Sequence, residues 1–167
     1  MKTKNVMIFI LVLLGLFALM WWSKPQASQI IGVTTEITSG TLTVEEKFYD
    51  FGTISMSDGN VEKTFQITNS TDKDITLKTV TTSCMCTTAY IGGGGGGEKG
   101  PFGMPGHGGT VPRANEVIRG GESRGIRVVY NPNAHGPAGF GLIDRFIYLE
   151  EATGGILELE IKAVVTP

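Results

Sequence analysis

Short alternating segments after Gly40 are the feature that most limits what this chain can fold into. The clearest is ILELEIKAVV, Ile156–Val165, in which Ile156, Glu158, Glu160 and Lys162 alternate with Leu157, Leu159, Ile161 and Ala163. A period of two is typical of a β-strand with one buried face, and no segment in this part keeps the 3.6-residue period of an amphipathic helix. The sequence therefore predicts an all-β domain.

Turn residues separate further segments of this kind. Val61–Asn69 places Phe65 and Ile67 on one face, and Asn69-Ser70-Thr71 after it is typical of a turn. About seven strands in about 125 residues predict a β-sandwich. The other strands are expected over Leu42–Gly52, Asp74–Cys84, Gly125–Asn131, Leu142–Glu151 and Ile156–Val165.

Large aromatic and paired charged side chains on these strands have simple structural interpretations. The aromatic ones are expected in the core, and the charged pairs are expected on solvated strand faces or at protected edges. The aromatic set is Phe48, Phe51, Phe65 and Phe146, and the charged pairs are Asp144 with Arg145 and Glu150 with Glu151.

An unbroken apolar run, Val6–Trp22, follows Lys2 and Lys4 near the N-terminus. As a helix this run would be roughly 26 Å long, close to the lower limit for crossing a bilayer. An uncleaved anchor is favoured over a cleaved signal peptide because no good small-residue cleavage site follows. The excess of lysine before the run predicts a cytoplasmic N-terminus, with the domain on the other side of the membrane. We expect a membrane anchor or signal segment over 1–22, a flexible tether over 23–40 and the sandwich over 41–167.

Four ordered motifs make the chain similar to a known family. They are FYDFGTI at 48–54, TFQITNSTDKDITLKTVTTSCMCT at 64–87, IRGGESRGIRVVYNP at 118–132 and the closing strand ILELEIKAVV. The series resembles the bacterial domain-of-unknown-function family 1573, an immunoglobulin-like group related to Hydin-type domains, over roughly Leu42 to Pro167. S-C-x-C-T is the most specific motif, although Met85 stands where glycine is usual. The resemblance implies an immunoglobulin-like sandwich and no established activity.

Cys84 and Cys86, the only two cysteines, allow three interpretations. On an extended strand, residues two apart point to the same face with Cα atoms roughly 6.5–7 Å apart, which suits a shared soft metal ion better than a disulfide. A turn beginning at Met85 would instead permit a small disulfide ring. The third interpretation is inert packing of two small side chains.

A glycine-rich insertion at 92–110 follows the cysteine pair and adds two candidate ligands, Met104 and His107. Glycine makes up 11 of the 18 residues from Gly92 to Gly109, so the rest of the chain can still build a core. His135 lies in another loop rich in glycine and proline and is the weakest candidate. Thiolate, thioether and imidazole together favour copper as Cu(I), with zinc second.

Composition and motifs exclude several functional classes. A net charge of −2 does not indicate the basic surface that is typical of a nucleic-acid-binding protein. GESRG, Gly121–Gly125, precedes a predicted strand, whereas the serine-hydrolase elbow leads into a helix, and C-x-C lacks the context of thioredoxin-like enzymes. We therefore expect no enzyme. The prediction is a membrane-tethered, extracytoplasmic binding or structural module with an envelope protein as partner, and a Cu(I)-binding protein is the alternative.

Overall fold

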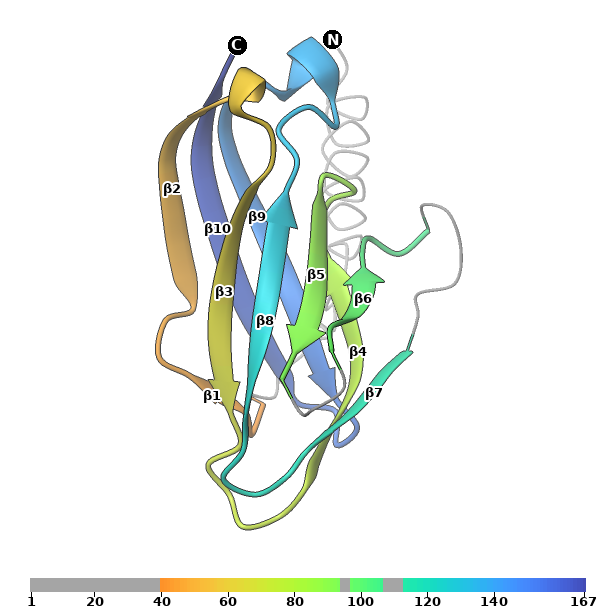
Figure 1. Ribbon diagram of the computed structural model, residues 1–167. Helices are drawn as coiled ribbons and strands as arrows, with labels where there is room; N and C mark the ends of the chain where they lie inside the picture. The colour runs from red at the N-terminus through yellow and green to blue at the C-terminus, as the bar shows by residue number, and fades with distance from the viewer. Residues whose placement is uncertain (1–39, 94–96, 107–112) are drawn as a thin grey trace, which may run out of the picture. The chain divides into compact units, whose positions relative to one another are not determined.

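The computed structural model describes residues 40–93, 97–106 and 113–167, which form two five-stranded β-sheets packed face to face (Figure 1). The first sheet has the order β1-β3-β8-β5-β6, and the second has the order β2-β10-β9-β4-β7. All strand pairs are antiparallel except β2 with β10. The strands are β1 Thr43–Val44, β2 Phe48–Ser55, β3 Val61–Thr68, β4 Ile75–Thr82, β5 Thr87–Gly92, β6 Lys99–Phe102, β7 Arg113–Ile118, β8 Ser123–Tyr130, β9 Gly141–Glu151 and β10 Ile156–Thr166. Two 3-10 turns, η1 Met56–Asp58 and η2 Gly136–Gly139, lie between strands.

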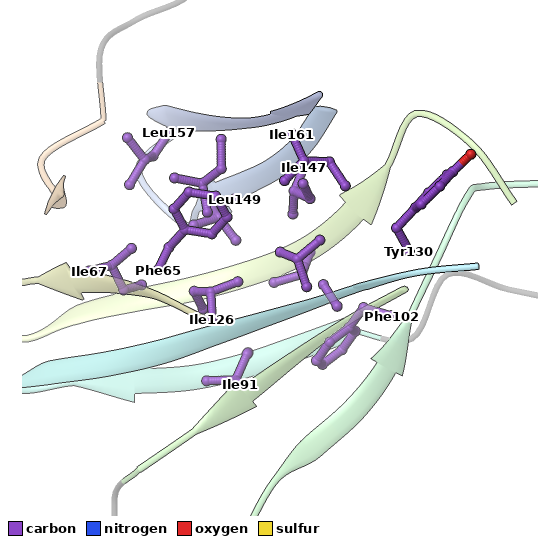
Figure 2. Close-up of a cluster of buried hydrophobic side chains, with 14 of the residues drawn as sticks. Phe65, Ile67, Ile91, Phe102, Ile126, Tyr130, Ile147, Leu149, Leu157 and Ile161 are labelled. Carbon is purple, nitrogen blue, oxygen red and sulfur yellow. The ribbon is translucent and has the colours of Figure 1, made fainter. Parts of the chain in front are cut away.

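The core lies between the sheets, and the period of two accounts for it. On β10 every second residue from Leu157 to Val165 is buried, as the alternation predicts. Phe65 and Ile67 of β3 face these residues from the other sheet (Figure 2). The all-β, sandwich-like architecture is thus confirmed for the described residues.

A β-bulge changes the alternation on β4. The pairing of β4 with β7 and β9 shifts between Leu77 and Thr79. As a result Leu77, Val80 and Thr82 are buried, although 77 and 80 have opposite parity. The extra residue of a bulge reverses the side chains that follow it.

The prediction of about seven strands was too low, because the described part of the chain already contains ten. β5, β6 and β7 were not expected. They are short, and β6 lies inside the glycine-rich insertion, where Ile91 pairs with Lys99 and Ala89 with Phe102. Glycine content and short length hide such strands from a periodicity test.

The core assignment was wrong for Phe48, which is 42% exposed. Phe48 pairs with Glu160 on the outer side of the β2–β10 pair. Its ring lies 5.2 Å from the Lys162 ammonium, an arrangement that suits an aromatic face in contact with solvent. Phe65 is buried as expected, and Phe51 and Phe146 are half-buried.

Glu151 was also misassigned, because it is buried instead of solvated. Its carboxylate accepts hydrogen bonds from the Leu42 amide at 2.8 Å and from the Thr153 hydroxyl at 3.1 Å. Glu151 shares the inward face of β9 with Ile147 and Leu149. Glu151 therefore connects Leu42, at the start of the domain, to the turn between β9 and β10.

Arg124, at the start of β8, has a side chain that is only 8% exposed. Its guanidinium donates to Glu116 at 3.3 Å, to Glu122 at 3.0 Å and to the Val117 carbonyl at 3.2 Å. Burial opposes ionisation of Glu116, but hydrogen bonds from Lys99 and Arg124 outweigh it and hold the pKa of this carboxyl below its ordinary value of 4.5. The ionised pair therefore stabilises the fold at neutral pH.

We expect Arg124→Met to lower the free energy of unfolding at pH 7 by about 2 kcal/mol, less than for a fully buried pair because both carboxylates keep some exposure. A depressed pKa contributes stability above its unfolded value and loses it as pH falls through the folded value, so the deficit should shrink between about pH 5 and pH 3. Urea unfolding at each pH measures this. Arg119→Met is the matched control, since the Arg119 side chain is 75% exposed. A deficit that does not depend on pH would contradict the assignment.

No helix within 40–93, 97–106 and 113–167 is long and apolar enough to cross a membrane. The expected anchor at 1–22 and nearly all of the tether at 23–40 lie outside the described residues.

Candidate functional site

The cysteines lie in the turn that connects the two sheets between β4 and β5. β4 ends at Thr82 and β5 begins at Thr87, so the crossing takes only four residues. The Thr87 amide donates to the Cys84 carbonyl at 3.1 Å, which closes the turn. The Thr82 hydroxyl is 3.0 Å from the carbonyl oxygens of both Cys84 and Thr87. This buried hydroxyl therefore stabilises the turn.

Cys84 and Cys86 are joined as a disulfide. Their Cα atoms are 5.3 Å apart, closer than two alternate residues of an extended strand, because the chain turns at Met85. The structure thus follows the disulfide interpretation of the sequence. The two sulfurs differ in environment, since Cys84 is half-buried whereas Cys86 is only 3% exposed.

His135 lies beside the disulfide although it is far away in the sequence. Its Nε2 atom is 3.2 Å from Cys84 Sγ. The loop between β8 and β9 carries this histidine, and the Asn131 amide ties that loop to the cysteine turn by donating to the Cys86 carbonyl at 2.8 Å. Both connections lie at the same end of the sandwich in Figure 1.

Arg145 of β9 contacts the other sulfur. Its Nε donates to Cys86 Sγ at 3.2 Å, and its Nη1 donates to the Asp144 carbonyl at 2.7 Å. The interpretation of Arg145 as part of a solvated face was wrong, because it is half-buried on the same face as Ile143 and Ile147. Strict alternation along LIDRFIYLEE would have placed Arg145 on this inward face.

The positive charge of Arg145 also affects Tyr130, a buried residue of the core. Burial raises the pKa of the Tyr130 hydroxyl, and the charge of Arg145 partly offsets this effect. In Figure 2 Tyr130 stands apart from the aliphatic cluster, at one end of the core. The disulfide thus lies where the apolar core meets a fixed cation.

The ligand atoms of Cys84, Cys86 and His135 all lie within 4.8 Å of one another. Two thiolates and an imidazole are soft or borderline donors, which suit Cu(I) and zinc and do not suit Mg²⁺ or Ca²⁺. Thiolates would arise only after a two-electron reduction of the disulfide. The geometry therefore allows either a disulfide or a three-ligand metal site at this position.

The other predicted ligands are placed differently. His107 lies outside the described residues. Met104 is half-buried and follows Gly103, whose carbonyl accepts a hydrogen bond from the Thr82 amide at 3.3 Å. The insertion therefore runs beside the last residue of β4, two positions before Cys84. The structure places His135, the candidate that the sequence ranked last, beside the sulfurs.

Solved structures with a similar fold include a protein of unknown function from Porphyromonas gingivalis W83, with a TM-score of 0.52 and 17% identity, over 81% of this chain and 51% of that one. This chain thus spans about half the length of that protein. The secreted serine protease VesC from Vibrio cholerae matches with a TM-score of 0.46 and 16% identity over 75% of this chain and 24% of its own. The YadV chaperone matches with a TM-score of 0.42 and 10% identity over 77% of this chain and 52% of its own. The likeness to the Porphyromonas protein shows the fold alone, and no curated protein matches the sequence.

The sequence profile of a family described as protein of unknown function (DUF1573) matches residues 42–92. This segment runs from the start of the domain to the end of β5 and contains both cysteines. His135 and Arg145 lie beyond it. Over residues 42–92 the match agrees with the resemblance of the sequence to the domain-of-unknown-function family 1573.

Proposed function

We propose that this chain is a membrane-tethered, extracytoplasmic module with an immunoglobulin-like fold that binds Cu(I) in its reduced form. One observation carries the proposal: the sulfurs of Cys84 and Cys86 and a ring nitrogen of His135 lie within 4.8 Å of one another. A single soft ion can reach three donors at such separations after small side-chain movements.

Charge favours Cu(I) over zinc at these residues. Two thiolates, a neutral imidazole and Cu(I) carry a net charge of −1. Arg145, whose Nε is 3.2 Å from Cys86 Sγ, supplies the balancing positive charge. With Zn²⁺ the same ligands are already neutral, so the guanidinium would add uncompensated positive charge, and tetrahedral zinc would need a fourth ligand. Zinc is therefore the second choice.

Two features support the proposed location. The apolar run Val6–Trp22 has the composition of a membrane anchor, with lysines before it that favour a cytoplasmic N-terminus. The Cys84–Cys86 disulfide suits an oxidising compartment outside the cytoplasm. Fractionation should recover the full-length chain with the membrane, and external protease should cut the domain in spheroplasts. Recovery as a freely soluble cytosolic protein would contradict the location.

Titration of the full chain in detergent with Cu(I), against a chromophoric chelator, tests the binding proposal. The protein reduced with a phosphine should take up one Cu(I) per chain. With the oxidised protein Cu(I) should stay bound to the chelator, because disulfide sulfurs are poor ligands compared with thiolates. Failure of the reduced protein to compete for a stoichiometric amount would overturn the proposed function.

The contribution of His135 gives a separate prediction. His135→Ala should weaken Cu(I) binding by roughly 10- to 100-fold, because loss of one ligand leaves a two-coordinate bis-thiolate site. The same chelator competition measures the change. His107→Ala is the informative comparison, since the sequence also offers that histidine. A loss confined to His107→Ala would contradict the assignment of His135.

Binding of an envelope protein is a second candidate function, supported by exposed apolar side chains on the outer face of the second sheet. Leu142 is 75% exposed and pairs with Val164, which is 42% exposed. Adjacent exposed apolar side chains of this kind often mark contact surfaces. A photo-crosslinking residue at Leu142 should capture a specific envelope protein in cells, whereas one at Thr64, exposed on the other sheet, should not. Equal capture at both positions would remove this candidate.

A further inference from the structure

We propose that the Cys84–Cys86 disulfide undergoes thiol–disulfide exchange with an external dithiol, which attacks Cys84 and expels Cys86 as the leaving thiolate. This activity goes beyond Cu(I) binding and does not depend on it. It rests on the different surroundings of the two sulfurs, which make the disulfide chemically asymmetric.

Access favours attack at Cys84. Cys84 is half-buried and is flanked by the exposed residues Met85 and His135. Cys86 is only 3% exposed, and its sulfur lies against Arg145 Nε at 3.2 Å and Thr87 Oγ1 at 3.7 Å. The rate of exchange depends on which sulfur an incoming thiolate can reach. An external thiolate therefore meets Cys84 first.

The leaving group is stabilised at Cys86. When the disulfide bond breaks, negative charge develops on the sulfur that is not attacked. The guanidinium of Arg145 is always charged and already donates to Cys86 Sγ. A cation beside a sulfur lowers the energy of its thiolate, and a more stable thiolate leaves faster. Arg145 thus lies beside Cys86, the sulfur that leaves when an external thiolate attacks Cys84.

The exchange balances with a dithiol as reductant. Its first thiolate forms a bond to Cys84 Sγ, the Cys84–Cys86 bond breaks, and the electron pair remains on Cys86. Its second thiolate then attacks the first donor sulfur, and Cys84 leaves as a thiolate. The donor becomes a disulfide, and the Cys84–Cys86 pair gains two electrons. His135 Nε2, 3.2 Å from Cys84 Sγ, lies within hydrogen-bond reach of the released sulfur.

Glutathione, a monothiol, tests which sulfur is attacked. The oxidised full chain in detergent is mixed with glutathione and quenched with acid, and free thiols are then blocked with N-ethylmaleimide. Fragmentation of the peptide that contains both cysteines locates each label. We expect glutathione on Cys84 in about tenfold excess over Cys86. Equal labelling, or an excess on Cys86, would overturn the proposal.

The role of Arg145 as a positioning residue is tested by the rate of reduction by dithiothreitol. Arg145→Gln should slow reduction by about tenfold, because the leaving thiolate loses its cation. Arg145→Lys should restore most of the rate, whereas a purely structural loss would not be rescued by charge. Arg119→Gln is the control for loss of one positive charge at an exposed position. Near-ultraviolet circular dichroism verifies the fold of each variant, and equal rates for Arg145→Gln and Arg119→Gln would contradict the mechanism.

The two proposals fail separately. Exchange is measured on the oxidised protein without metal, and Cu(I) binding is measured on protein reduced beforehand by a phosphine. Selective labelling of Cys84 without Cu(I) uptake would end the copper proposal alone. Stoichiometric Cu(I) uptake with unselective labelling would end the exchange proposal alone.

Discussion

Replacing both Cys84 and Cys86 with serine is expected to abolish stoichiometric Cu(I) binding by the reduced protein. A serine hydroxyl is a hard donor that stays protonated at neutral pH, so only the imidazole of His135 would remain. The loss should exceed about 100-fold, which is the upper range for residues that merely support a metal ligand. Chelator competition on the reduced double variant measures it.

The double variant should remain folded, which makes the result interpretable. The disulfide closes a loop of only three residues, Cys84 to Cys86, so its entropic contribution is only about 1.6 kcal/mol. The large core between the two sheets is untouched. Met85→Ala, which changes the exposed residue between the cysteines, is the matched control and should bind as the parent does. A Cys84→Ser/Cys86→Ser variant that bound Cu(I) as tightly as the parent would end the copper proposal.

The second large effect is expected at Asn69, whose side chain organises the turn after β3. Asn69 is fully buried. Its amide nitrogen donates to the Lys73 carbonyl at 2.7 Å and to the Ile118 carbonyl at 2.9 Å. Its amide oxygen accepts from the Thr71 amide at 3.0 Å and from the Thr71 hydroxyl at 2.7 Å. One side chain therefore satisfies polar groups on three separate residues.

Asn69→Ala should lower the free energy of unfolding by about 3 kcal/mol, because buried carbonyl and amide groups lose their partners. For a domain of this size the melting temperature should fall by about 10 °C. Differential scanning calorimetry measures both quantities. Asn60→Ala, at an exposed position before β3, is the matched control and should change stability little. Equal stability of the two variants would show that the Asn69 hydrogen bonds contribute nothing net.

Agreement between sequence and structure is best where local pattern and burial coincide. β3, β9 and β10 are long and lie within their sheets, so the period of two along them reports one buried face. The expectation fails on β4, where a bulge after Leu77 reverses the pattern, and at β6, a strand of four residues in a glycine-rich segment. A bulge is set by pairing with the neighbouring strands, so it leaves little trace in the residues themselves.

Prediction of the candidate site was incomplete for a similar reason. The C-x-C spacing identified Cys84 and Cys86, and the possibility of a turn at Met85 left a disulfide as one of three interpretations, which the structure then follows. The rank of the histidines depended on distance along the chain, which favoured the insertion near the cysteines. His135 is 51 positions from Cys84, yet their side chains touch. Arg145, 59 positions from Cys86, escaped notice because a charged residue on a strand was assumed to face water.

By itself the sequence determined an all-β domain, the cysteine pair and the most regular strands, since each is a property of residues close together along the chain. Only the tertiary structure decided which loops share one end of the sandwich, and hence that His135 and Arg145 lie on either side of the two sulfurs. The physical reason is that sheet order and crossing loops arise from the burial of distant strands against each other. That burial places β8 beside β5 and the β4–β5 turn against β9, a proximity that no local pattern encodes.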